Sequence, residues 1–459
     1  MRQKRACPTS APAWRQAGQA VFLACCAMLS TAASPVYAET LGQVIETALK
    51  THPRVLAAVA QRRAAAQDLS QAQAGYLPSL DVNLSGGKER TDTPQVRAGG
   101  SSAASLVRRE AGITLSQKLF DGKATSSEIE RQSARLDAAS SRLTEVREEF
   151  ALRAAEIYIE VLKNRRLVKL ANDNLRSHLR TLEKIRQRVE GGVSQRVDLQ
   201  QAMGRVALSK SVASARAGKL RESNANYQNV VGHLPGELAE PEVKTANLLK
   251  EGAIDSDVLA QAIEQASETA VRSSPSLNAA KAEISAAEAS VRAARAPNYP
   301  RLNLELSANR NQNLAGIPGD FNNEAMMLVM RWNLFRGGAD QAQERAAAER
   351  RFAAIDTAAS TRRNVEERVA VALHAKATNE ERLAFLLEHV TLSEGVLESY
   401  QQQFELGRRT LLDVLNAENE LFTARSNLVA GQYEYLVSQY AAEAAQGMLM
   451  GSLGITPAD

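Results

Sequence analysis

The side chains best suited to catalysis or metal binding are scattered along this sequence rather than gathered in a motif. The histidines, at positions 52, 178, 233, 374 and 389, form no H-E-x-x-H pair and have no second ligand at helical spacing. The sequence also contains no G-x-x-x-x-G-K-[ST] phosphate loop and no G-x-S-x-G nucleophile elbow. We therefore expect no enzymatic activity, no metal site and no cofactor.

Residues 1–38 have the features of a secretory signal peptide. Four basic residues precede an apolar run from Ala20 to Leu29, and Val36-Tyr37-Ala38 matches the pattern that a signal peptidase cleaves. All three cysteines fall in this segment, so the mature chain has no thiol for a disulfide, a metal or covalent catalysis. Lipidation at Cys25 is the alternative, because Phe22-Leu23-Ala24 before it partly matches a lipobox.

Without this leader the charges of the chain are balanced. The whole sequence has 56 Lys and Arg against 52 Asp and Glu, and the leader holds four of the basic residues and none of the acidic ones. The global basic signature of a nucleic-acid-binding protein is therefore absent. No apolar stretch of about 18 residues follows the leader, so the sequence predicts no membrane-spanning helix. An exported protein of this kind is free in the periplasm, secreted, or held in the outer membrane by a β-barrel.

The sequence is internally repeated. At an offset of 222 residues, 12 of the 34 positions in 52–85 are identical to those in 274–307. An offset of 215 then aligns Leu119-Phe120-x-Gly122 with Leu334-Phe335-x-Gly337. Because repetition over such a long period indicates duplicated structural units, we predict two equivalent halves.

Each half contains one very long predicted helix. Lys123 to Glu190 is a stretch of 68 residues without glycine or proline, and Ala339 to Glu394 is a similar stretch of 56. Proline in a helix interior costs about 3 kcal/mol, so its absence over such lengths indicates continuous helix. Apolar residues recur about every seven positions, as in the file from Leu383 to Phe404, which predicts a left-handed coiled coil.

Two shorter helices can cover each long one. In the first half these are 53–75 and about 195–231, and the chain reverses between the long helix and the second short helix at Gly191-Gly192. We predict that the two halves, 39–240 and 241–459, form two rods. Each has the order short helix, strand pair, long helix, return helix.

A pair of strands is predicted between the first short helix and the long helix of each half. Apolar and polar residues alternate around Leu80–Leu84, Ile113–Leu119, Leu302–Leu306 and Met326–Leu334, which is typical of half-buried strands. Each predicted strand has about 8–12 residues, the length that crosses a membrane in a tilted barrel. We expect 86–105 and 309–323 to be surface loops. An ordinary hairpin is the alternative for any single pair, but four strands at one end of two rods favour a barrel.

Four strands per chain are too few to close a membrane barrel. Known spanning barrels need about eight strands or more. Lipid also offers no hydrogen-bond partner to an unpaired strand edge. The chain is therefore expected to assemble with further copies of itself, in a number that this reasoning leaves open.

Several motifs, ordered along the mature chain and partly duplicated, carry a family resemblance. They are Leu41-x-x-Val44-Ile45-x-x-Ala48-Leu49-x-x-His52-Pro53, Tyr76-Leu77-Pro78-Ser79-Leu80, Leu334-Phe335-Arg336-Gly337-Gly338 and the segment from Phe404 to Ala417. With these motifs the sequence resembles the TolC family of outer-membrane export proteins across essentially the whole mature chain.

The resemblance implies a fold class that is mainly α with a membrane β part. In it, a homotrimer forms a twelve-stranded β-barrel in the outer membrane, with four strands per chain, and a long periplasmic coiled-coil tunnel. It also implies docking to a periplasmic adaptor and to an inner-membrane ABC transporter or other pump. Thr51-His52-Pro53 and Ala74-Gly75-Tyr76-Leu77-Pro78 are similar to the branch that serves type I protein secretion. The channel of a multidrug efflux pump is the close alternative.

By motif position, the resemblance implies a constriction at the periplasmic tips of the coiled coils. Arg409 would reach toward the Val197-Asp198 turn, and Asp413 would line the constriction as an acidic ring. Phe404 stands where the family often has a tyrosine that hydrogen-bonds to the acid matched by Asp198. Asn416 stands where a second acidic ring can occur. We therefore expect weaker closure and weaker cation affinity than in a channel with the full set.

Each of these tip residues also has a purely structural interpretation. Thr410-x-x-Asp413 is a capping box that can open the return helix. Arg409 can be a solvated charge, and Phe404 continues an apolar file and can belong to the core. The glycines at the tips, Gly191, Gly192 and Gly407, are expected to be turn residues.

A periplasmic adaptor or a structural coiled-coil protein is the alternative from another class. An adaptor usually has one helical hairpin between β-domains and an inner-membrane anchor, whereas this chain has two hairpin-bearing halves and neither feature. A heat-modifiable trimer in the membrane fraction favours the channel, and a soluble monomer favours the adaptor.

Overall fold

The computed structural model describes residues 38–100, 103–241 and 256–455. Apart from Ala38, the predicted signal peptide lies outside the described residues. The α-helices are α2 (Leu41–Thr51), α3 (Pro53–Ala74), α4 (Pro94–Ala98), α5 (Ala124–Glu190), α6 (Arg196–Val231), α7 (Ser256–Ser273), α8 (Pro275–Ala294), α9 (Ala339–Glu405), α10 (Leu411–Ala445) and α11 (Leu449–Ser452). The strands are β1 (Ser79–Thr91), β2 (Ala104–Phe120), β3 (Arg301–Gln312) and β4 (Asp320–Arg331), and the short 3₁₀ turns are η2 (Ala296–Asn298) and η3 (Leu314–Gly316).

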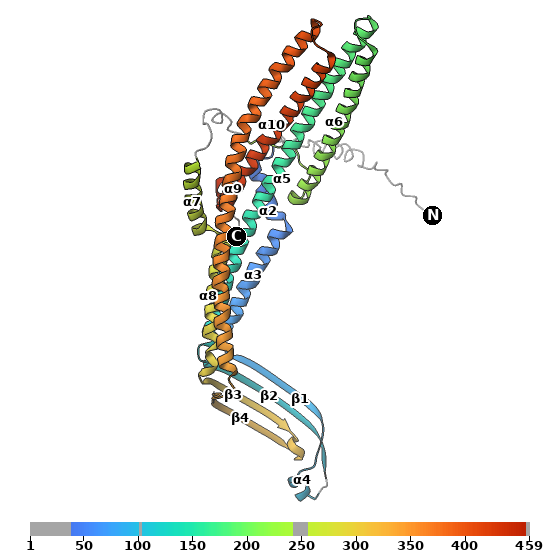
Figure 1. Cartoon of the computed structure of the whole chain (residues 1–459). Helices are drawn as coiled ribbons and strands as arrows, with labels where there is room; N and C mark the ends of the chain where they lie inside the picture. The colour runs from blue at the N-terminus through green and yellow to red at the C-terminus, as the bar shows by residue number, and fades with distance from the viewer. Residues whose placement is uncertain (1–37, 101–102, 242–255, 456–459) are drawn as a thin grey trace, which may run out of the picture.

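The two long helices, α5 and α9, organise the helical part, and the sheet lies at one end of it (Figure 1). Near the sheet, α3 packs on α5 and α8 packs on α9, whereas α6 and α10 cover the other ends of the same two helices. This is the predicted arrangement of two short helices along each long one. Within the described ranges, no helix combines the length and the hydropathy needed to cross a membrane.

The first short helix of each half begins in the same way. His52 precedes Pro53, and its Nδ1 accepts a hydrogen bond from the backbone N–H of Arg54 at 3.2 Å. Ser274 precedes Pro275, and its hydroxyl accepts from the backbone N–H of Leu277 at 3.4 Å. Proline suits the first helical position because its missing N–H would have no partner there.

The second long helix continues past its glycine-free stretch. That stretch stops at Glu394, but α9 runs through Gly395 to Glu405, in agreement with the apolar file from Leu383 to Phe404, and reaches 67 residues, the same length as α5. A Cβ at Gly395 would meet no atom within 4 Å, so this glycine has no role in packing. A single exposed glycine costs a helix only about 1 kcal/mol relative to alanine, which the packing of α9 on α10 outweighs.

The four strands form one antiparallel sheet in the order β1-β2-β3-β4. Leu80 pairs with Leu115, Leu115 with Leu306, and Leu306 with Met326. Because directly opposed residues point to the same side, this register aligns the apolar positions of all four strands on one face. That face is exposed in the single chain: the exposed fraction is 77% for Leu84 and 72% for Met326.

The opposite face of the sheet is polar. It carries Asp81 and Asn83 of β1 and, opposite them, Thr114 and Gly112 of β2. Farther along, Arg108 bonds to both Glu89 and Glu110, so these charges neutralise one another across the strand pair.

The strands of the first half extend farther than predicted. Residues 86–105 were expected to be a loop, but β1 and β2 remain paired from Gly86 with Arg109 to Thr91 with Ala104. The bonds of Arg108 to Glu89 and Glu110 hold the charged positions within the sheet. The expectation of a loop was therefore wrong at both ends of the segment, and the same holds for 309–323, where β3 runs to Gln312 and β4 begins at Asp320.

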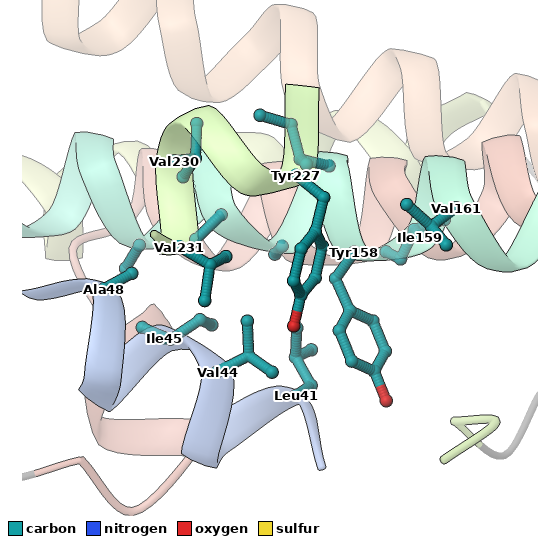
Figure 2. Packing of buried hydrophobic residues seen from close by; sticks show 14 of the residues in the cluster. Leu41, Val44, Ile45, Ala48, Tyr158, Ile159, Val161, Tyr227, Val230 and Val231 are labelled. Carbon is teal, nitrogen blue, oxygen red and sulfur yellow. The ribbon is translucent and has the colours of Figure 1, made fainter. Parts of the chain in front are cut away.

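The main hydrophobic core lies midway along the helical part, where α2 packs on α5 and α6. Figure 2 shows Val44 and Ile45 of α2 beside Val231 of α6, with Tyr158 of α5 and Tyr227 of α6 in the same cluster. The Tyr158 hydroxyl lies 2.8 Å from the backbone oxygen of Glu39 and 2.5 Å from that of Ala239. This core therefore fixes the start of the described chain to the segment after α6.

Candidate functional site at the helical tips

The two helical hairpins reverse at the end of the molecule farthest from the sheet (Figure 1). The turn between α5 and α6 contains Gly191 and Gly192, and the turn between α9 and α10 contains Gly407. Gly192 and Gly407 have positive φ angles of 76° and 73°. Side chains are disfavoured in this conformation, so both positions require glycine. Gly191 has a φ of −78° and makes no such demand.

Both return helices begin with an aspartate that caps the helix. Asp198 Oδ2 accepts a hydrogen bond from the backbone N–H of Gln195 at 3.1 Å. Asp413 Oδ2 accepts from the backbone N–H of Thr410 at 3.2 Å and from its hydroxyl at 2.8 Å. The predicted capping box at Thr410 is thereby confirmed, and it places both carboxylates at equivalent positions of the two tips.

The cap determines the charge state of Asp413. Its pKa lies below the ordinary value, chiefly because the Thr410 hydroxyl and then the Thr410 backbone N–H donate to the carboxylate. The Arg409 guanidinium adds a smaller attraction from 3.8 Å. Asp413 therefore carries its negative charge at neutral pH, as a residue of an acidic ring must.

Within this chain, Arg409 makes its contacts in its own hairpin. Its Nε donates to Gln403 Oε1 at 3.1 Å, and its guanidinium carbon lies 4.2 Å from the ring centroid of Tyr400. The Val197-Asp198 turn, toward which the resemblance directs Arg409, is on the other hairpin, and Val197 is exposed there. The structure thus brings Arg409 together with Asp413 and not with Asp198.

Phe404 is a packing residue between the tips. Together with Leu182, Val189 and Leu199, it is half-buried against a small core of Ile185, Ala202, Leu411 and Leu415, which come from α5, α6 and α10. The guanidinium of Arg188 covers one face of its ring. The structural interpretation of Phe404 as a core residue is confirmed.

Asn416 links the two hairpins by a polar contact. Its side-chain oxygen accepts a hydrogen bond from Arg205 of α6 at 2.6 Å. Asn416 is exposed one turn beyond Asp413, on the same return helix. A neutral amide here satisfies Arg205 without adding a second negative charge.

The sequence reasoning missed one group near the tips. His178 of α5 and Glu418 of α10 are both buried, and His178 Nδ1 lies 3.0 Å from Glu418 Oε2. His178 was classed only as one of the scattered histidines. A sequence signal was present, because His178 occupies a position three residues after Leu175 and four before Leu182 in the apolar repeat, where a polar side chain needs a partner.

The described residues of the tips do not form a metal site. In the described part of the chain, no three His, Cys, Asp or Glu side chains are grouped so that they could hold a metal ion. What the site offers is two carboxylates that cap helices, the guanidinium groups of Arg188, Arg205 and Arg409, and an apolar contact between hairpins. Such a set can attract cations and hold two helical hairpins together.

Comparison with known proteins gives consistent results over most of the chain. The family model described as "Outer membrane efflux protein" matches residues 44–233 and 266–447. The chain is 24% identical to the outer membrane efflux protein BepC of Brucella suis, over 91% of this chain and 87% of BepC. It is also 24% identical to the outer membrane protein TolC of Vibrio cholerae, over 92% of this chain and 94% of TolC.

Solved structures give the same picture of the fold. A structure of CusC superposes with a TM-score of 0.75 and 19% sequence identity, covering 88% of this chain and 91% of CusC. The element order and the sheet therefore have a counterpart in a protein described as forming a transmembrane channel.

Proposed function

This chain belongs to the outer membrane efflux protein family, and we propose that it is the outer-membrane duct of a type I secretion system. It is an outer-membrane protein whose sheet lies in the membrane and whose helical part extends into the periplasm. Its family consists of channels rather than enzymes. In the proposed role it passes a protein from an inner-membrane ABC transporter and its periplasmic adaptor to the exterior.

One observation carries the proposal: the four-stranded sheet has an apolar exposed face, a polar face and two unpaired edges, β1 and β4. In lipid an apolar outer face is favourable, but an unpaired strand edge is costly because its N–H and C=O groups have no partner. Pairing β1 of one copy with β4 of the next removes both edges. Three copies then give twelve strands, with the polar faces lining a pore.

The helical tips suit the inner end of such a duct. In a trimer, three copies of Asp413 would form an acidic ring, and Arg409 and Asp198 would lie at contacts between neighbouring tips. Phe404 holds the two hairpins of one chain together by packing rather than by a hydrogen bond to Asp198. With Asn416 neutral, we infer a constriction that carries less negative charge and closes less firmly than one with two acidic rings.

Small solutes are a second candidate for the cargo. The motifs around His52 and Tyr76 support protein secretion, whereas the names of two relatives, the outer membrane efflux protein BepC and the cation efflux system protein CusC, refer to efflux. CusC of Escherichia coli aligns over 61% of this chain and BepC over 91%, so secretion is placed first on the two motifs and not on the relatives.

A deletion of this protein separates the two candidates. Proteins in the medium and sensitivity to a panel of toxic solutes are compared in the parent, the deletion strain and the complemented strain. A type I duct gives a missing secreted protein that accumulates inside the cell, and complementation restores it. Unchanged secretion with a lower tolerance of small toxic molecules would instead establish efflux.

A further inference from the structure

A buried polar contact joins the two hairpins a short distance from the tips. His178 Nδ1 of α5 lies 3.0 Å from Glu418 Oε2 of α10, and their side chains are only 4% and 5% exposed. Thr181 donates to the other oxygen, Glu418 Oε1, at 3.2 Å, and Ser177 approaches the same oxygen at 3.5 Å. One oxygen of a buried carboxylate on α10 is thus hydrogen-bonded to α5, while the other lies next to the His178 ring without a hydrogen bond.

This pair lies beside an apolar contact between the hairpins. On the tip side of Glu418, Leu415 of α10 packs with Ile185 of α5. On the other side, Leu421 and Ala424 of α10 pack on Val390 of α9, within the second hairpin. Burying a carboxylate costs free energy unless it is paired and hydrogen-bonded, and an apolar side chain would carry no such cost. Polar residues in helical seams are known instead to fix register, because a displaced helix leaves them without a partner.

The charged groups on the neighbouring helices are engaged elsewhere. Arg205 of α6 donates to Asn416, and Arg425 of α10 pairs with Glu394 of α9. His389 of α9 faces Glu420 of α10 at 3.3 Å, on the surface of a single hairpin. On α5, Arg176 pairs with Asp173. None of these contacts reaches Glu418, and among the described residues the His178 ring is the ionisable group that lies against its carboxylate.

We propose that His178 and Glu418 form a latch that holds the α9–α10 hairpin against the α5–α6 hairpin in the closed register. α10 is the helix through which the second hairpin packs on both α5 and α6. Outward movement of α9 and α10 would therefore have to break this contact. The inference rests on the proposed function, because it concerns the opening of the constriction assigned there to the tips.

The chain offers a matched control for testing the latch. His178→Gln and Glu418→Gln keep the approximate size of the side chains but remove the imidazole–carboxylate pair between hairpins. His389→Gln and Glu420→Gln remove the same chemistry from an exposed pair within one hairpin. All four variants of the full mature chain are purified as trimers, checked for heat-modifiable migration and melting temperature, and reconstituted in planar bilayers for single-channel recording.

The latch predicts that either buried variant raises the open-to-closed ratio at least about tenfold, since losing one partner of a buried pair is strongly unfavourable. The two exposed variants are expected to have the open-to-closed ratio of the wild type. The exchange His178→Glu with Glu418→His should return the ratio toward the wild-type value, which a general loss of stability would not do.

Three results would overturn the latch. In the first, the buried variants form intact trimers with wild-type gating. In the second, the exposed variants raise the open-to-closed ratio as much as the buried ones do. In the third, the exchanged protein has the melting temperature of the wild type but its channel stays open. A wild-type chain that forms no pore in the bilayer would contradict the proposed function itself, whereas a normal wild-type pore with any of these three results contradicts only the latch.

Discussion

The guanidinium carbon of Arg188 lies 4.8 Å from the ring centroid of Phe404. Arg188 is in the last turn of α5 and Phe404 is in the last turn of α9, so this contact joins the two hairpins at their ends. A cation over an aromatic ring contributes about 0.5–1 kcal/mol at an exposed site. The ring is thus held from one side by charge and from the other by the small apolar core of the tips.

Phe404→Ala should loosen the tips. It removes both the cation contact and the apolar contacts of the ring; fully burying such a side chain contributes about 1.5–3 kcal/mol, and this half-buried ring contributes less. We expect a higher open-channel probability in bilayer recordings of the purified trimer. Leu406→Ala is the control, because Leu406 is 72% exposed in the same turn. Equal gating in the two variants would show that the ring does not restrain the tips.

Asp413→Asn should weaken block of the channel by divalent cations. The amide oxygen can still cap α10, so the change removes the ring charge and preserves the turn. Single-channel conductance at increasing cation concentration measures the block. If block is unchanged in Asp413→Asn, Asp413 does not form the acidic ring.

Thr410→Ala is the complementary variant, since it weakens the cap and keeps the carboxylate. The hydrogen bond from the Thr410 hydroxyl is the largest cause of the lowered pKa of Asp413, so its loss should raise that pKa toward its usual range, although the backbone N–H still donates. A carboxylate with a lowered pKa loses its charge, and the stability of its cap, only as the pH falls through that lowered value. Cation block in Thr410→Ala should therefore disappear at a higher pH than in the wild type.

Gly431→Ala should destabilise the second hairpin. A Cβ at this position of α10 would lie 2.6 Å from Leu386 Cδ1 of α9, so the helices must move apart or Leu386 must change rotamer. Overpacking of this kind costs about 1–3 kcal/mol. Gly395→Ala, which meets open space on α9, should instead be neutral or stabilise by up to about 1 kcal/mol. Denaturant unfolding followed by circular dichroism compares the two, and equal effects would contradict the close approach at Gly431.

Val82→Arg should impair folding into the membrane. Val82 belongs to the apolar face of β1, where a buried charge near the middle of a bilayer costs about 2–4 kcal/mol. Asn83→Arg places the same side chain on the polar face and should have little effect. Heat-modifiable trimer in the outer-membrane fraction is measured for both. If Asn83→Arg reduced the amount of trimer more than Val82→Arg does, the polar face would be the one that contacts lipid.

Tyr158→Phe should weaken the central core. The hydroxyl bonds to the backbone oxygens of Glu39 and Ala239, and its burial raises the pKa of Tyr158 to about 12, so it remains a donor at neutral pH. Leaving those oxygens without this donor costs about 1–3 kcal/mol. Tyr433→Phe is the control, because Tyr433 is also a buried residue, but within the described ranges its hydroxyl makes no hydrogen bond. The free energy of unfolding is measured for both variants, and it should fall more in Tyr158→Phe than in Tyr433→Phe.

The long helices and the faces of the strands could be predicted because their signals are local. Absence of proline and a seven-residue apolar repeat define α5 almost to the residue, and a period of two places Val82 on one face and Asn83 on the other. At the end of α9 two local signals disagree. Gly395 is unfavourable in a helix, whereas the apolar file that continues to Phe404 favours one, and the packing of α9 along α10 agrees with the apolar file.

Contacts between segments distant in sequence were also beyond prediction. The extension of β1 past Gly86 depends on Arg108 meeting Glu89 across the strand pair. At the tips, the resemblance identified Asp413 and Phe404, but the pairing of His178 with Glu418 joins residues 240 positions apart along the chain. Such pairing is decided by how the two hairpins lie against each other, which no single stretch of sequence encodes.

The equal length of α5 and α9 has a consequence for how this molecule can change. At about 1.5 Å per residue, each of these 67-residue helices measures about 100 Å, so the two hairpins extend equally far from the sheet. Adding or removing one heptad in a single helix would leave its hairpin about 10 Å longer or shorter than its neighbour. Changes in reach across the periplasm must therefore occur in both helices at once, together with the return helices that cover them.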